Sequence, residues 1–220
     1  MAWDIYTEDF ADLTDWTDGD VNDGVSEISP AGELHQKNTL TTGIGWLTQD
    51  IGTIGSGDYT FEIKFKFDVV PAAYYSDMLD IDAGTNKIRL AFHEGAVQCY
   101  TGAAYTNLFA YTWVADTWYV IRGIIHESQT DIDTYLDGVS KSTNIACAYS
   151  TGTDGMVTIG ANAFAAVAGC EWSIDYLYIG AGQQVPSTTS IKKVSGVAYA
   201  SIKKIGGVAI GSVKKIGGVE

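Results

Sequence analysis

Strict alternation of apolar and polar residues is the feature of this sequence that most limits its fold. Segment 59–69, YTFEIKFKFDV, places four apolar side chains at alternate positions and charged side chains between them. The apolar set is Phe61, Ile63, Phe65 and Phe67. Successive side chains of a strand point to opposite faces, so the segment is predicted to be a half-buried antiparallel strand. Segment 87–92, KIRLAF, repeats the pattern between the turn-forming stretches AGTN and HEGA, which predicts a meander.

Further segments alternate in the same way, and loops rich in Gly, Ser, Thr, Asn and Asp separate them. They are AVQCYTG, TWYVIRGIIHE, DIDTYLDGVSK, GMVTIGA and EWSIDYLYIG. Sustained helical spacing is absent, and AFAAVAG at 163–169 comes nearest to a turn of helix. Hydrophobic residues make up 46% of the chain, which is ample for a two-layer core. We therefore expect an all-β fold, a two-sheet antiparallel jelly-roll sandwich.

The C-terminal segment has a different organisation from the rest of the chain. SIKKVSGVAYA, SIKKIGGVAIG and SVKKIGGVE are three copies of an eleven-residue unit. We predict a sandwich domain at 1–182, a linker at 183–189 and a basic repeat tail at 190–220. An eleven-residue period also suits a helical supercoil, but the glycines and β-branched residues of each unit favour short strands.

Units this small cannot bury their own apolar faces, so the tail is expected to oligomerise or to attach to a partner. Through the tail, the chain is expected either to form a homo-oligomer, with a trimer favoured, or to join a larger protein assembly. The residues expected to make these contacts are Ile191, Lys192, Lys193, Ile202, Lys203, Lys204, Ile205, Val213, Lys214, Lys215 and Ile216.

Charge is distributed unevenly along the chain. Residues 1–189 hold 7 basic and 26 acidic side chains, net −19, whereas residues 190–220 hold 6 basic and 1 acidic, net +5. A body this acidic repels nucleic acid. The acidic residues are interpreted as keeping the protein soluble through mutual repulsion, as binding calcium, or as forming a docking surface for a basic partner.

Localisation is predicted from what the sequence lacks. No run approaches the ~20 apolar residues of a membrane span, and the N-terminus has no secretion signal. The protein is expected to be made in a cytoplasm and then to be virion-associated or released by lysis. Cys99, Cys147 and Cys170 have no paired spacing and are interpreted as buried free thiols.

Three segments carry a resemblance to a known superfamily. In WDIYTEDFADLTDWTDGDVNDGVSEISPAGELHQ the matching residues are Asp9, Phe10, Asp12, Trp16, Gly32 and Leu34; in DTWYVIRGIIHESQTDIDTYLDGVSKST they are Trp118, Tyr119, Tyr135, Asp137 and Gly138; in CEWSIDYLYIG they are Ile174, Asp175, Leu177, Ile179 and Gly180. These segments resemble the concanavalin A-like lectin/glucanase jelly rolls, laminin-G-like modules included. The resemblance covers residues 3–182 and implies the fold, while the superfamily includes lectins, hydrolases, lyases and adhesion modules.

Catalytic motifs of that superfamily are missing. The E-x-D-x-x-E strand of laminarinase-type members and the Q-I-H and Y-K-x-Y motifs of alginate lyases do not occur. The nearest carboxylate pairs are Asp80 with Asp82, Asp131 with Asp133, and Glu171 with Asp175, for which strand solvation or turn capping is favoured over catalysis. We therefore expect no enzyme activity.

Two kinds of binding site have candidate residues. Asp15, Asp18, Asp20 and Asp23 crowd one early loop, which fits either calcium or solvated turn acids. Tyr74, Tyr75, Tyr105, Tyr111 and Trp113 lie in loop-like stretches, where they fit either stacking on a sugar or core packing. A structural or adhesion protein of a virus- or phage-like particle is the favoured function. A free carbohydrate-binding module and a polysaccharide hydrolase or lyase are the alternatives.

Overall fold

The chain forms strands and, within the described residues, no helix. The computed structural model describes residues 3–22, 24–38, 44–70, 76–82, 87–93, 95–149, 151–162, 170–184, 193–194, 197–198, 204–205 and 208–209. Two compact units are present, Met1–Gln184 and Val185–Glu220, and the predicted domain end at residue 182 lies near their division. In the described part of the chain, no helix has the length and apolarity to cross a membrane. The helical turn expected at 163–169 lies outside the described residues.

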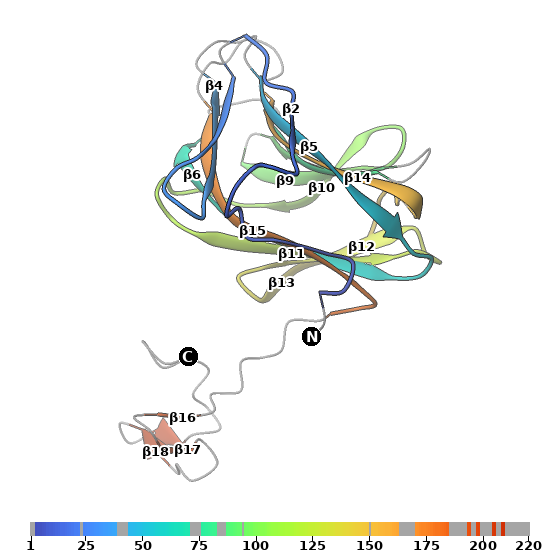
Figure 1. Ribbon diagram of the computed structural model, residues 1–220. Coiled ribbons are helices and arrows are strands. Elements are labelled where there is room, and N and C mark those ends of the chain that lie inside the picture. Colours follow the sequence, from blue (N-terminus) through green and yellow to red (C-terminus); the bar gives the residue numbers. More distant parts are fainter. Residues whose placement is uncertain are drawn as a thin grey trace. The chain divides into compact units, whose positions relative to one another are not determined.

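The first unit consists of two antiparallel sheets that pack face to face (Figure 1). Sheet A has the strand order β13-β12-β11-β6-β15-β4-β3, and β1 also pairs with β15. Its strands are β1 (Tyr6–Glu8), β3 (Val25–Ile28), β4 (Leu34–Asn38), β6 (Tyr59–Val69), β11 (Tyr119–His126), β12 (Asp131–Leu136), β13 (Val139–Ala146) and β15 (Cys170–Ala181).

Sheet B has the order β10-β9-β8-β7-β14-β5-β2. Its strands are β2 (Thr17–Asp18), β5 (Ile44–Ile54), β7 (Ser76–Asp82), β8 (Lys87–His93), β9 (Ala96–Tyr100), β10 (Tyr105–Ala110) and β14 (Gly152–Asn162). The predicted all-β sandwich of two antiparallel sheets, of jelly-roll type, is confirmed.

The core lies between the sheets and is rich in aromatic residues. Phe65 and Phe67 of β6 are fully buried, as the alternation predicted. Their ring centroids lie 5.3 and 4.9 Å from that of Phe92 on β8, which joins sheet A to sheet B. Burying each such side chain contributes roughly 1.5–3 kcal/mol. The same alternation leaves the polar residues of each strand on the two outer faces.

The second unit contains two short hairpins in its described residues. β16 (Lys193–Val194) pairs with β17 (Val197–Ala198), and β18 (Lys204–Ile205) pairs with β19 (Val208–Ala209). Equivalent residues of the two hairpins are eleven positions apart, which is the period of the sequence repeat. Three residues expected to make tail contacts, Lys193, Lys204 and Ile205, lie in these strands; the others, Ile191, Lys192, Ile202, Lys203, Val213, Lys214, Lys215 and Ile216, lie outside the described residues.

Candidate functional site

A row of polar and aromatic residues crosses the outer face of sheet B. Register places Thr48 of β5 opposite Thr158 of β14, Thr158 opposite Asp80 of β7, and Asp80 opposite Arg89 of β8. Leu90 of β8 pairs with Cys99 of β9, so the preceding Arg89 lies beside the following Tyr100. Tyr100 in turn pairs with Tyr105 of β10, which ends the row. All six members are partly exposed. Five strand intervals of ~4.8 Å give this row a length of about 24 Å.

An ion pair fixes the centre of the row. Arg89 donates from Nε to Asp80 Oδ1 at 3.0 Å and from Nη2 to Asp80 Oδ2 at 2.9 Å. Its Nη1 donates to the hydroxyl of Tyr105 at 3.1 Å, and the ring of Tyr105 lies 5.5 Å from that of Tyr100. A bidentate guanidinium–carboxylate contact has a defined orientation, so Asp80 orients Arg89, and Arg89 in turn positions the Tyr105 hydroxyl.

Trp46, on β5, forms an aromatic shelf next to the row. Its side chain is 38% exposed, although Leu47 beside it is buried in the core. A Cβ atom on Gly19 would lie 2.6 Å from Trp46 Cδ1 and 2.9 Å from Nε1, so the indole rests directly on the Gly19 backbone. The Trp46 amide donates to Asp20 Oδ1 at 2.7 Å, and the Gly19 amide donates to the Trp46 carbonyl at 3.0 Å. The indole is thus supported from the protein side, and the exposed part of the ring is available to a ligand.

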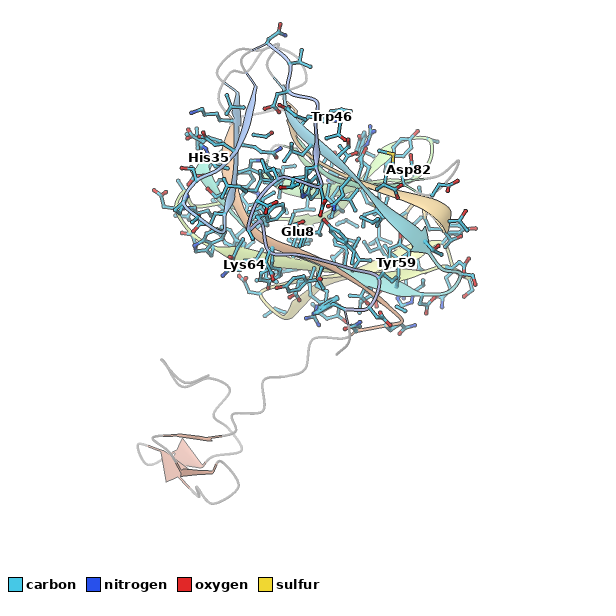
Figure 2. All side chains as sticks on the ribbon, viewed as in Figure 1. Glu8, His35, Trp46, Tyr59, Lys64 and Asp82 are labelled. Carbon is cyan, nitrogen blue, oxygen red and sulfur yellow. The ribbon has the colours of Figure 1, made fainter. Side chains whose placement is uncertain are left out.

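Acidic side chains flank the row on the same face. Met156 of β14 lies between Asp50 of β5 and Asp82 of β7 in the strand register. Asp82 is two positions from Asp80, so both carboxylates point to the outer face. Figure 2 labels Trp46 and Asp82 on sheet B, with His35 and Lys64 on sheet A. The face therefore combines hydroxyl groups, carboxylates and exposed aromatic rings.

The residues predicted to contact sugar fall in different places. Tyr105 belongs to the row, whereas Tyr111 lines an open pocket of about 550 Å³ together with Gly95, Ala110 and Thr112. Partial burial raises the pKa of the Tyr111 hydroxyl. Tyr74 and Tyr75 lie outside the described residues.

Trp113 requires a correction, because it belongs to the core. Its side chain is 8% exposed, and its ring packs edge-on at 5.0 Å from Phe92 and 4.9 Å from Tyr119. Core packing, the alternative interpretation of this residue, accounts for its position, since neighbouring aromatic rings leave no free face for a sugar.

Trp46, Tyr100 and Arg89 were not predicted. For Trp46, the sequence pattern that could have indicated exposure is its outward position in the alternation of GWLTQD, beside the inward-facing Leu47.

Each of the three carboxylate pairs considered for catalysis has a member that is held by a structural partner. Asp80 binds Arg89, Asp175 binds Lys64, and His35 Nε2 lies 2.9 Å from Glu171 Oε1. Asp133 Oδ1 accepts from the Asn144 amide at 2.8 Å, and Asp131 is 8% exposed in β12. These contacts fit strand and turn roles.

The carboxylates of the early acidic loop accept hydrogen bonds from backbone amides of the loop and of neighbouring strands. Asp20 accepts from the Ser26 amide at 2.6 Å and from the Trp46 amide, and Asp18 Oδ1 accepts from the Asp20 amide at 2.8 Å. Asp15 is exposed, and Asp23 lies outside the described residues. Among the described residues, no three His, Cys, Asp or Glu side chains are grouped in a way that could hold a metal ion.

Comparison with known proteins identifies the fold and no family. No family model matches the sequence, and no curated protein matches it either. Solved structures do match. A sialidase superposes with a TM-score of 0.57 at 12% identity, over 80% of this chain and 18% of the sialidase. The cellulose-induced protein Cip1 superposes at 0.58 and 10% identity, over 81% of this chain and 98% of Cip1.

Botulinum neurotoxin type C, whose cell entry depends on interaction with two ganglioside molecules, superposes at 0.55 and 12% identity, over 76% of this chain and 44% of the toxin chain. The chain thus spans less than two thirds of the sialidase and of the toxin, but nearly all of Cip1. At these identities the likeness shows the fold alone.

Proposed function

We propose that this chain is a lectin-like carbohydrate-binding protein and that the outer face of sheet B holds the glycan. The observation that carries the proposal is the Trp46 shelf, an exposed indole seated on the backbone of Gly19. Sugar recognition requires an aromatic surface for the apolar side of a pyranose and polar groups for its hydroxyls. The similarity to sandwich folds in a sialidase and a ganglioside-binding toxin supports the same interpretation.

Each part of the face has a role in this proposal. Trp46 stacks on a pyranose ring, and the hydroxyls of Thr48 and Thr158 lie in the neighbouring row. Asp80 and Arg89, held together by their ion pair, offer an acceptor and a donor to sugar hydroxyls. The sandwich would then be concanavalin A-like, as the sequence resemblance implies, with a binding role and no catalytic one.

Exchange of Trp46 for alanine tests the proposal. A glycan array with the full chain first identifies ligands, and isothermal titration then gives Kd for the strongest. Trp46→Ala is expected to weaken binding at least ~10-fold, because buried aromatic anchors dominate such contacts. Trp118→Ala is the matched control, since Trp118 is a partly exposed tryptophan that lies beside Lys64 and Lys66 of sheet A. Binding that survives Trp46→Ala, or that is lost equally in both variants, would refute the proposal.

A second proposal concerns the tail, which would join copies of the chain, a trimer being favoured, or attach it to a virus- or phage-like particle. It is supported by the two hairpins that recur eleven residues apart and by the net charge of +5 in residues 190–220. Light scattering of the full chain and of residues 1–184, at low and high salt, tests it. The full chain is expected to be oligomeric and the shorter chain monomeric; equal masses would contradict the proposal.

A further inference from the structure

A chain of hydrogen bonds leads from the core face of sheet A to the Trp46 shelf. In the strand register, Ser26 of β3 lies opposite Gln36 of β4, and Gln36 lies opposite the buried Trp172 of β15. Trp172 Nε1 donates to Gln36 Oε1 at 3.1 Å, and Gln36 Nε2 donates to Ser26 Oγ at 2.9 Å. Nε2 also donates to the Ile159 carbonyl of sheet B at 3.2 Å. The fully buried Gln36 amide therefore has one defined orientation.

Asp20 joins this chain to Trp46. Ser26 donates from Oγ to Asp20 Oδ1 at 2.7 Å and from its amide to Asp20 Oδ2 at 2.6 Å. Asp20 Oδ1 also accepts the Trp46 amide at 2.7 Å, so the same carboxylate binds β3 and β5. Gly19 precedes Asp20, and its amide donates to the Trp46 carbonyl at 3.0 Å. Trp46 is thus held through both its amide and its carbonyl, with Gly19 beneath the indole.

Gly45, the residue before Trp46, packs against the same part of sheet A. A Cβ atom on Gly45 would lie 2.9 Å from the Val25 carbonyl oxygen and 3.4 Å from Gln36 Cβ. The two sheets are therefore in direct contact at the base of the shelf. A change in the position of β3 or β4 is passed on to the strand that carries the indole.

From these contacts we infer that Asp20 and Ser26 are positioning residues of the glycan site, which raise its affinity by holding the Trp46 shelf in place. The inference rests on the proposed function. Neither side chain has to touch the sugar. Hydrogen bonds to a charged acceptor are stronger than those between neutral groups, so the Asp20 carboxylate is the main link. Ser26 and the buried Gln36 orient that carboxylate from the core side.

The expected size follows from the rotamers of Trp46. A side chain has three staggered χ1 wells, and the shelf is formed by the one that seats the indole on Gly19. If the three wells become equally populated, the binding-competent fraction falls to about one third, and the apparent Kd rises about threefold. Removal of the ring itself, in Trp46→Ala, is expected to cost more, at least ~10-fold.

Exchange of Ser26 for alanine tests the inference in the full chain. Ser26→Ala removes the hydroxyl between Asp20 and Gln36, and it should raise the Kd for an array-selected glycan about threefold by isothermal titration. Asp20→Ala, which removes the whole carboxylate, should cost at least as much. Ser173→Ala is the matched control, because Ser173 of β15 also donates from Oγ to an aspartate, Asp68, at 2.7 Å. The control should leave the Kd unchanged.

Two measurements separate positioning from a general loss of stability. In the Trp46→Ala background, Ser26→Ala should not change the Kd further, because its effect acts through the missing ring. In the protein without ligand, the heteronuclear ¹H–¹⁵N NOE of the Trp46 Nε1–H group reports the mobility of the indole on the ps–ns timescale. It should fall in Ser26→Ala and keep the parent value in Ser173→Ala.

Three results would overturn the inference. They are a Trp46 indole that is as ordered in Ser26→Ala as in the parent, an equal loss of affinity in Ser26→Ala and Ser173→Ala, and a loss that persists in the Trp46→Ala background. The proposed function survives each of them when Trp46→Ala itself weakens binding. A Kd that Trp46→Ala leaves unchanged overturns the proposed function, and the inference with it.

Discussion

Gly123 of β11 allows an aromatic ring to cover the backbone of sheet A. Gly123 is paired with Phe61 of β6, whose side chain is fully buried. A Cβ atom on Gly123 would lie 2.3 Å from Phe61 Cζ, 2.4 Å from Cε1 and 2.9 Å from Ile132 Cδ1. The ring therefore occupies the space that any other residue at this position needs.

Replacement of Gly123 by alanine is predicted to destabilise the fold by about 2–3 kcal/mol. Overpacking a filled core costs roughly 1–3 kcal/mol, and the contact here falls on a ring enclosed by core residues, so the upper end applies. Loss of conformational freedom in the unfolded chain returns about 0.4–1 kcal/mol. Gly55→Ala is the control, because a Cβ atom there meets nothing within 4 Å.

Urea unfolding followed by tryptophan fluorescence measures the effect. Gly123→Ala should lower the transition midpoint with an unchanged slope, whereas Gly55→Ala should stay within ~1 kcal/mol of the parent. Phe61→Leu combined with Gly123→Ala should be less destabilising than the sum of the two changes, because the residues share one space. A Gly123→Ala variant as stable as the control would refute the packing argument.

Three further predictions follow from single contacts. Gly19→Ala should displace the indole of Trp46 and weaken glycan binding at least ~10-fold by titration, with thermal unfolding little changed, because Gly19 supports the shelf. Arg122→Met should cost about 3 kcal/mol in urea unfolding, since it leaves the buried carboxylate of Glu62 without its cation, and adding Glu62→Gln should recover part of that loss. Burial raises the pKa of the Cys99 thiol to about 12. The neutral thiol therefore contributes its full share to the free energy of unfolding below pH 9, and this contribution is lost as the pH rises toward 12. Unfolding of the parent and of Cys99→Ala at about pH 8 and about pH 10.5 should therefore show a steeper decline in the parent, and parallel declines would contradict this.

Local sequence patterns predicted the strands and turns well, because alternation and turn chemistry act over a few residues. The alternation of segment 59–69 gave the buried face of β6 correctly. Asp137 and Gly138 have φ values of 50° and 77°, as a two-residue hairpin turn requires, and they separate β12 from β13. Phe10, Trp16 and Leu34, from the first segment of the superfamily resemblance, are buried in the core.

The site could not be predicted in the same way, since it depends on pairing between distant segments. Thr48 and Thr158 are neighbours because β5 and β14 pair, although they are far apart in the sequence. Exposure of single aromatic residues also depended on such contacts. Trp113 looked loop-like but packs against Phe92 and Tyr119. Trp46 points to the outer face of its strand, and its ring rests there on Gly19, which is distant in the sequence.

The indole signals of the six tryptophans give the most direct test of where glycan binds. A two-dimensional ¹H–¹⁵N spectrum of the labelled chain, recorded during titration with an array-selected glycan, resolves each Nε1–H group. We predict that the Trp46 signal shifts with saturation while the signals of buried Trp113 and Trp172 stay in place. A shift confined to Trp118, with Trp46 unmoved, would contradict it.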